Sequence, residues 1–147
     1  MKQGFSLMEL LISISIVAIL VAIGVASYAT VNKQSRDTKR KGDVEQIRAA
    51  LEMYRADNGY YPAAGAGAWV IASSATDATA GLTPYLVSSY ISVVPRDPKS
   101  AQSYMYQATN LSGSSYYGYC ISTLLEAEDP SDTCTPYTGQ NYGLRQP

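Results

Sequence analysis

The chain of 147 residues carries 11 lysines and arginines against 12 aspartates and glutamates, which leaves a net charge of −1. A near-neutral chain without a broad basic stripe is not expected to bind nucleic acid, because phosphate-binding proteins present clustered Lys and Arg. The sequence has no histidine, no nucleophile-elbow or phosphate-loop motif, and only two cysteines, so we expect a protein that is not an enzyme.

The N-terminal segment is the most informative part of the sequence. Between Lys2 and Lys33 the only ionised side chain is Glu9. At ~1.5 Å per helical residue, the uncharged run from Leu10 to Asn32 reaches across the ~30 Å core of a bilayer. We therefore predict a transmembrane helix over residues 5–32. A lone carboxylate at the edge of such a helix is costly in hydrocarbon and indicates a functional role.

The segment Gly4-Phe5-Ser6-Leu7-Met8-Glu9, followed by the apolar run, resembles the class III signal of type IV pilins and of the pilin-like subunits of type II secretion systems. The resemblance implies that residues 1–4 are a leader and that a prepilin peptidase cuts between Gly4 and Phe5 and methylates Phe5. It also implies that Glu9 faces the terminal amine of a neighbouring subunit. An ordinary signal peptide and a plain membrane anchor are the alternatives for this segment.

The function implied by the resemblance is that of a structural subunit of a type IV pilus-like filament. Its expected partners are copies of itself and other pilins, the prepilin peptidase, the inner-membrane assembly platform and the membrane. We expect a single-pass inner-membrane protein with a cytoplasmic N-terminus, which later joins an extracellular or periplasmic filament. A pseudopilin of a type II secretion or DNA-uptake system is one alternative. A monomeric, membrane-anchored extracytoplasmic binding domain is another.

The helical pattern continues beyond the apolar run. Val44, Ile47, Leu51 and Tyr54 recur at intervals of three and four residues, which predicts a helix with one face buried in the head. Asn58-Gly59 offers a left-handed cap, and Pro62 follows where a helix cannot continue. We therefore predict one helix from Phe5 to about Asn58, of which residues 33–58 belong to a head over residues 33–147. The outward-facing residues are Asp43, Glu45, Arg48, Glu52 and Arg55.

The rest of the head is expected to form a small antiparallel sheet, which gives an α+β pilin fold. Ser103–Thr109 and Ser115–Thr123 are rich in Tyr, Ile and Met between Gly and Ser breakers. Further short elements are expected at 68–72, 82–87 and 141–145. The segment Ala50–Pro62 resembles the helix end of the major pseudopilin. The chain departs from the family at Ala26, where many pilins have proline, and in its cysteine pair, which is more pilin-like than pseudopilin-like.

Cys120 and Cys134, the only cysteines, are most simply understood as a disulfide in an oxidising compartment. The five basic residues after the apolar run (Lys33, Arg36, Lys39, Arg40 and Lys41) instead favour a cytoplasmic head by the positive-inside rule. We side with the resemblance, and expect these cations to meet lipid head groups or neighbouring acids.

The loop between the cysteines contains several acids. We expect no cofactor, with calcium as the weak candidate, because hard cations take clustered carboxylates and the resemblance implies a calcium-binding loop in the major pseudopilin. A solvated loop without metal is the alternative. The thirteen tyrosines are either interface residues or half-buried strand residues, and we favour the second. The candidate calcium ligands are Glu126, Glu128, Asp129 and Asp132.

Overall fold

The computed structural model describes residues 5–73, 81–127, 134 and 137–146. It forms two compact units, Met1–Ser35 and Arg36–Pro147, and the helix α1 (Leu7–Asn58) runs through both. The first unit contains only the N-terminal part of α1 among its described elements. The second contains the rest of α1, the single turn η1 (Ala64–Gly67), the short helix α2 (Thr83–Leu86) and the strands β1 (Val70–Ile71), β2 (Met105–Ser112), β3 (Ser115–Thr123) and β4 (Tyr142–Arg145).

Helix α1 begins at Leu7 rather than at the predicted Phe5. The cause is Ser6, whose hydroxyl oxygen accepts a hydrogen bond from the Met8 N–H at 3.3 Å, while its carbonyl accepts the N–H groups of Glu9 and Leu10. Serine in this position satisfies N–H groups that have no partner inside the helix. Phe5 therefore lies just outside the helix.

The first unit presents its apolar side chains to the surroundings. The large apolar residues from Phe5 to Val31 are exposed by 52% at Ile12 to 85% at Leu7. The hydroxyls of Ser13, Ser15 and Ser27 donate to carbonyl oxygens four residues earlier, so these polar groups are satisfied within the helix. The helix is thus long and apolar enough to cross a membrane, by length and composition.

The second unit buries the predicted face of α1. Val44, Ile47 and Leu51 are fully buried, as expected, and Tyr54 packs at the edge of the core. The helix ends at Asn58, where Gly59 has a φ of +80° and donates its N–H to the Arg55 carbonyl. A left-handed residue at this point is the usual stop of a helix, and it confirms the predicted end.

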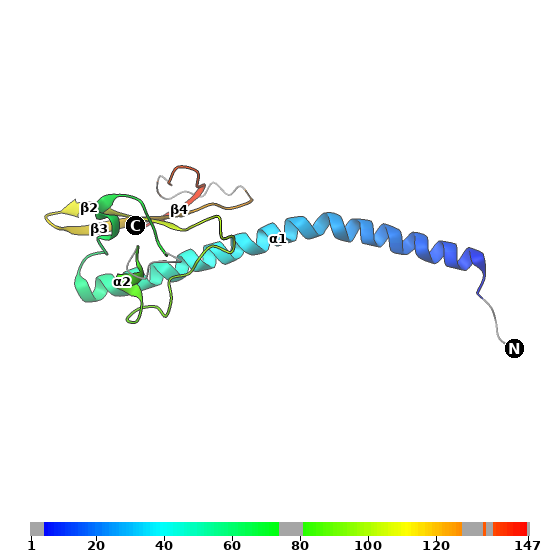
Figure 1. Cartoon of the computed structure of the whole chain (residues 1–147), viewed down its shortest axis with the longest axis horizontal. Coiled ribbons are helices and arrows are strands. Elements are labelled where there is room, and N and C mark those ends of the chain that lie inside the picture. The colour runs from blue at the N-terminus through cyan, green and yellow to red at the C-terminus, as the bar shows by residue number, and fades with distance from the viewer. Residues whose placement is uncertain (1–4, 74–80, 128–133, 135–136, 147) are drawn as a thin grey trace. The chain divides into compact units, whose positions relative to one another are not determined.

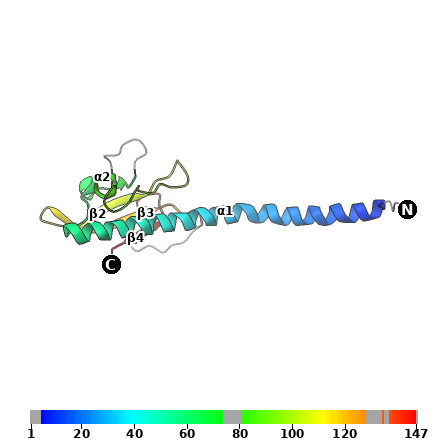
Figure 2. The ribbon, with the colours of Figure 1, turned by 90° about the horizontal axis from the view of Figure 1, so that it is seen from below.

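The strands form one antiparallel sheet in the order β1-β2-β3-β4. β2 and β3 make a hairpin with Ser112 opposite Ser115, and they lie alongside the second-unit part of α1 (Figure 1, Figure 2). Because side chains alternate between the two faces of a strand, Tyr104, Tyr106 and Ala108 point into the core shared with the helix. The structure therefore confirms the α+β arrangement of a long N-terminal helix packed on a small antiparallel sheet.

The shorter elements also lie near their predicted positions, with narrower bounds. The apolar run 68–72 contains β1, the segment 82–87 contains α2, and the C-terminal edge strand is β4. β2 extends three residues beyond the predicted Thr109, because its ladder with β3 continues to Ser112. The hydrogen-bonded pairing of β2 with β3 therefore extends to the tip of the hairpin.

Cys120 on β3 is joined to Cys134 by the expected disulfide, with the two Cα atoms 6.1 Å apart. The segment after β3 is also held by Asn141, whose side-chain oxygen accepts the Leu125 N–H at 2.7 Å and whose NH2 donates to the Leu125 carbonyl at 3.0 Å. Both ties connect the C-terminal segment to the sheet. They leave the start and the end of the cysteine loop fixed.

Candidate functional site

The first candidate site is the N-terminal end of α1. Glu9 lies in the first turn of the helix, where the partial positive charge of the helix terminus favours a carboxylate. Its side chain is exposed, as is Phe5 at 78%. The ion pairs among the described residues all lie in the second unit and do not include Glu9. Gly4 lies outside the described residues.

The second candidate site is a buried charge cluster centred on Arg40. The Arg40 side chain is completely shielded from solvent. Its Nε and Nη2 donate to the two carboxylate oxygens of Asp97, at 2.8 and 3.0 Å. Its Nη1 donates to Asp37 at 2.7 Å and to Glu126 at 3.0 Å, and Nη2 also donates to Gln102 at 2.8 Å. These bonds use all five N–H donors of the guanidinium group.

Glu126 joins the segment after β3 to this cluster. Its carboxylate accepts two hydrogen bonds of 2.6 Å from Arg36, and Lys99 lies 2.8 Å away. Its backbone N–H donates to Asp37 at 2.9 and 3.0 Å, and the Ala127 N–H donates to the same carboxylate at 2.8 Å. Asp37 thus works as a cap for the backbone of the cysteine loop.

The charges of the cluster balance. Three cations (Arg36, Arg40 and Lys99) face three carboxylates (Asp37, Asp97 and Glu126). Such balance is required for buried charges, since an unpaired ion away from water is strongly destabilising. The cluster draws its members from α1, the loop 95–103 and the segment after β3, so it fastens two distant segments onto the helix.

The cluster shifts the pKa values of its members. The pKa of Glu126 is far below its usual range because of hydrogen bonds from Arg36 and Lys99. Burial raises the pKa of Asp37, but the backbone N–H groups of Ala127 and Glu126 and the Arg40 guanidinium outweigh that effect and lower it. The bidentate bond to Asp97 raises the pKa of Arg40 further above its ordinary value. All three groups are therefore held in their charged forms.

The basic cluster that follows the apolar run is thus divided. Arg36 and Arg40 form ion pairs with acids of the head, which is the expected contact with neighbouring acids. The Lys41 ammonium lies 5.5 Å from the centroid of the Tyr142 ring, a cation–π distance. Sequence reasoning missed the roles of Asp37 and Asp97. The spacing of Asp37 and Arg40, three residues apart on a helix, was the one signal available for them.

Three expected surface residues of α1 also contact the head, and one of them is Arg55, which donates to the Tyr61 hydroxyl at 3.2 Å. Asp43 accepts a hydrogen bond from the Tyr104 hydroxyl at 2.7 Å. Glu52 accepts from Tyr61 at 3.0 Å and from Tyr119 at 3.3 Å. These carboxylates lie at the edge of the buried face, so they satisfy the hydroxyls of buried tyrosines instead of facing water. The pair Glu45–Arg48, at 3.2 Å, is an exposed ion pair as expected.

The calcium expectation rested on four acids, of which only Glu126 is described. Its carboxylate is occupied by Arg36, Arg40 and Lys99. The positions 128, 129 and 132 lie outside the described residues. Within the described ranges, no group of three or more His, Cys, Asp or Glu side chains is placed to hold a metal ion. Calcium binding by this loop stays a prediction.

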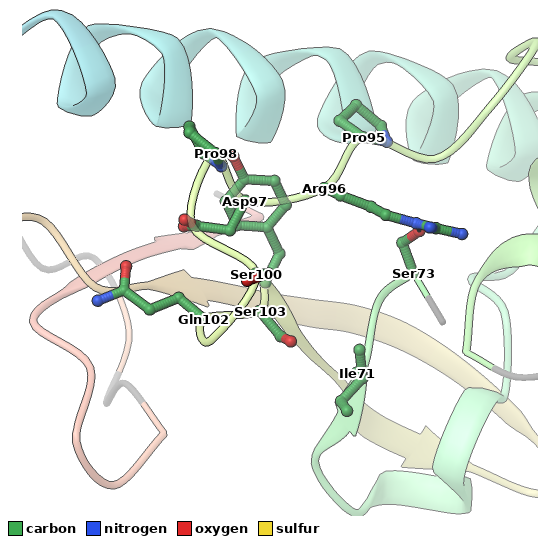
Figure 3. A pocket seen from close by; sticks show the side chains of 10 residues that line it. Ile71, Ser73, Pro95, Arg96, Asp97, Pro98, Ser100, Gln102 and Ser103 are labelled. Carbon is green, nitrogen blue, oxygen red and sulfur yellow. Dashed lines mark hydrogen bonds between the residues drawn. The ribbon is translucent and has the colours of Figure 1, made fainter. Parts of the chain in front are cut away.

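A hollow of about 470 Å³ lies beside the cluster, under the loop 95–103 (Figure 3). Pro95 and Pro98 lie on its side toward α1, and Ile71 lies opposite them. Arg96 extends across it, with its Nε 3.3 Å from the Ser73 hydroxyl. Asp97 also lines the hollow, and both of its carboxylate oxygens accept hydrogen bonds from Arg40.

Comparison with known protein families shows which family this chain belongs to. A model described as "Type II secretion system (T2SS), protein G" matches residues 28–118, more than half of the chain. The chain belongs to this protein G family. A second model, the prokaryotic N-terminal methylation motif, matches residues 1–25, and no solved structure gives a significant match.

Curated relatives agree with the protein G family. Type II secretion system core protein G of Pseudomonas aeruginosa is 39% identical over 61 residues, which are 42% of this chain and 43% of the relative. The core protein G of Klebsiella pneumoniae is 31% identical over 98 residues, 66% of this chain and 69% of the relative. The pilin-like protein PilA3 of Thermus thermophilus is 30% identical over 58 residues, 39% of this chain and 25% of the relative.

The two family models cover different parts of the two candidate sites. Gly4, Phe5 and Glu9 all fall inside the methylation motif. Arg40 and Asp97 fall inside the protein G match, which ends at residue 118. Glu126 and the disulfide lie beyond it. The side of the cluster formed after β3 is therefore a feature of this chain that the match with the protein G family does not cover.

Proposed function

We propose that this protein is a structural subunit of a pilus-like filament and assembles through its N-terminal helix. The observation that carries the proposal is the exposed, uncharged part of α1 with Glu9 in its first turn, attached to a folded head. Helices of this kind need apolar neighbours, first lipid and then like helices. The related pseudopilins and pilins are structural proteins, which supports a role other than catalysis.

Two kinds of system are candidates for the one that this filament serves. The protein G match and the relatives of that name support a pseudopilin of a type II secretion system. The pilin-like relative of Thermus thermophilus supports the other candidate, a pilin of a pilus-like filament. Both candidates require the same processing and the same assembly helix.

Processing prepares the end of the helix. The proposed prepilin peptidase cuts between Gly4 and Phe5 and methylates the new amine of Phe5. Since Phe5 precedes the helix and Ser6 caps it, the new amine would lie one turn from Glu9. The methylation motif over residues 1–25 supports this step.

Glu9 then sets the register between subunits. A carboxylate in an apolar bundle is costly unless a cation neutralises it. The terminal amine of a neighbouring subunit is such a cation, and opposite charges attract several-fold more strongly in a medium of low dielectric constant than in water. A stagger that joins the Glu9 carboxylate of one subunit to the Phe5 amine of the next neutralises both charges within the bundle.

The proposed location is the inner membrane, with the head outside the cytoplasm. The disulfide between Cys120 and Cys134 supports an oxidising compartment. The positive-inside rule opposes it, but Arg36 and Arg40 are neutralised by carboxylates of the head. An assembly platform in the inner membrane would then move the subunit from lipid into the filament.

The alternative to a filament subunit is a membrane-anchored monomer. One variant distinguishes the filament subunit from the monomer. We would express the chain in a bacterium with a matching assembly system and compare wild type, Glu9→Gln and the exposed-acid control Glu45→Gln in the sheared filament fraction. The filament proposal predicts that only Glu9→Gln is lost from filaments while it still accumulates in the membrane. Absence of all three chains from the filament fraction would support the monomer, and equal amounts of all three in filaments would contradict the role of Glu9.

A further inference from the structure

A second groove, of about 480 Å³, lies on the face of the sheet turned away from α1. Met105 forms part of its lining. Its neighbours Tyr104 and Tyr106 are buried in the core, and alternation along β2 places Met105 on the opposite face. Trp69 and Ile71 line the groove from the β1 side, and Tyr137 lines it from the segment before β4.

Two aromatic rings face the groove without serving the core. The Trp69 and Tyr137 rings contact each other edge to face, with centroids 5.9 Å apart and planes at 62°. Tyr137 is 40% exposed and Ile71 is 46% exposed. Neither ring belongs to the buried cluster that joins the sheet to the helix. Large aromatic side chains left at the surface are typical of binding surfaces.

The polar part of the groove consists of amides and hydroxyls. Among the described residues that line it, none is an Asp, Glu, Lys or Arg. Gln102 and Gln140 are fixed in place, since the first accepts from Arg40 and the second donates to the Ser103 carbonyl at 2.8 Å. Each of these amides keeps at least one N–H for another partner.

Further hydrogen-bonding groups of the groove have no partner among the described residues. With the described residues, the indole N–H of Trp69 and the hydroxyls of Tyr137 and Thr138 make no hydrogen bond. These groups line the same groove as the two glutamines. A ligand that covers them must therefore supply its own hydrogen-bonding groups, because burying them without partners costs free energy.

We propose that this groove binds a neutral saccharide. A sugar presents C–H groups to an aromatic ring and hydroxyls to amides at the same time, which matches the two kinds of group in this groove. A charged ligand would find no counter-charge among the described lining residues, and a purely apolar chain would leave the donors of the groove unpaired. The groove gives the subunit a binding role in addition to its role in assembly.

Trp69 is the only tryptophan in the chain, so its fluorescence reports directly on the groove. The test uses the full chain in a detergent without a sugar head group. A printed array of neutral and acidic glycans comes first, followed by titration of the best neutral binders against tryptophan emission. We expect saturable binding of neutral glycans that is insensitive to salt, because no ionic contact contributes.

Variants locate the binding. Tyr137→Ala removes one ring and is expected to weaken binding at least about tenfold. Thr138→Val removes one hydroxyl and no ring, and is expected to weaken binding a few-fold. The matched control is Tyr117→Ala, a tyrosine that is 46% exposed and lies outside the groove lining, and it should bind like wild type. Far-UV circular dichroism confirms that each variant is folded.

Three results would overturn the proposal. The first is failure of every neutral glycan on the array. The second is selective binding of acidic glycans, or of a proline-rich peptide, which also docks on aromatic grooves. The third is binding that folded Tyr137→Ala and Thr138→Val retain at wild-type strength, or that Tyr117→Ala loses equally.

Discussion

Arg40 on α1 and Asp97, 57 positions later in the chain, form a bidentate ion pair in which both side chains are completely shielded from solvent. The pair holds the loop 95–103 against the helix. With Asp37 and Glu126 it also holds the first part of the cysteine loop. The second unit is thus fastened to α1 by charge as well as by its apolar core.

Loss of Arg40 should destabilise the head strongly. Arg40→Ala leaves Asp37, Asp97 and Glu126 without their shared cation, and breaking a buried pair in this way costs about 3–5 kcal/mol. Arg40→Lys keeps the charge but not the planar fork of donors, so it should recover only part of the loss. Denaturant unfolding of the full chain in detergent, followed by far-UV circular dichroism, measures both effects.

The exposed pair supplies the control for that measurement. Arg48 contacts Glu45 at the surface, with side chains that are 40% and 52% exposed. Arg48→Ala should therefore change the free energy of unfolding by about 1 kcal/mol or less. A cluster without energetic importance would instead make Arg40→Ala and Arg48→Ala equally mild.

The stability of the head should fall in acid. The pKa values of Asp37 and Glu126 are lower in the folded chain than their ordinary values. A carboxyl group of this kind contributes its full stabilisation at pH values above its pKa in the unfolded chain, which is about 4. The contribution is lost as the pH falls from about 4 toward the lower pKa that the group has in the folded chain. Unfolding free energies measured from about pH 7 to about pH 2 should decline on the acid side of about pH 4.

Asp37→Asn should flatten that decline, because it removes one of the two groups that titrate. Glu45→Gln should keep the wild-type profile, since Glu45 makes only an exposed contact. A wild-type unfolding free energy that stays level across the whole pH range would contradict the electrostatic account of the cluster.

Removal of the disulfide should weaken the fold without abolishing it. The bridge joins two cysteines that are 14 positions apart in the sequence, and for a loop of this size the chain-entropy account gives roughly 3 kcal/mol. The double variant Cys120→Ser, Cys134→Ser should unfold at lower denaturant concentration by that amount. The contacts of Asp37 with residues 126 and 127, and of Asn141 with Leu125, should keep the segment docked.

Circular dichroism and limited proteolysis distinguish these outcomes. An intact strand signal with slow cleavage before residue 127 supports the non-covalent ties. Rapid cleavage there in the double serine variant would show that the disulfide alone holds the segment.

The end of the main helix should be sensitive to one glycine. Gly59 has a φ of +80°, and a Cβ added there would meet no neighbouring atom. Gly59→Ala therefore tests backbone conformation without a steric clash, and should cost about 1 kcal/mol. The same substitution at Gly42, which lies within the helix and also has free space, should stabilise instead. Thermal unfolding of both variants shows whether each substitution lowers or raises the stability of the chain.

Local patterns carried the prediction of the fold. The spacing of Val44, Ile47 and Leu51 predicts the buried face of α1, and Asn58-Gly59 predicts its end, because both signals depend on neighbouring residues. The hydroxyl of Ser6 is a further local signal, because serine is a residue type that favours the helix N-cap. The hairpin strands followed from their tyrosine-rich runs.

Contacts between distant segments were beyond the reach of the sequence. Arg40 looks like one of five similar cations, and nothing near it in sequence indicates that Asp97 and Glu126 surround it in the fold. The groove lined by Trp69 and Tyr137 depends on the same kind of information, since its two rings are brought together only by the sheet. Periodicity reports which face is buried, but not which distant residue lies against it.

The most direct test of the filament account is the intact mass of the chain after co-expression with a prepilin peptidase. The account predicts loss of Met1 to Gly4 and the gain of one methyl group on Phe5. An intact N-terminus, or a cut within the apolar run near position 26, would contradict it.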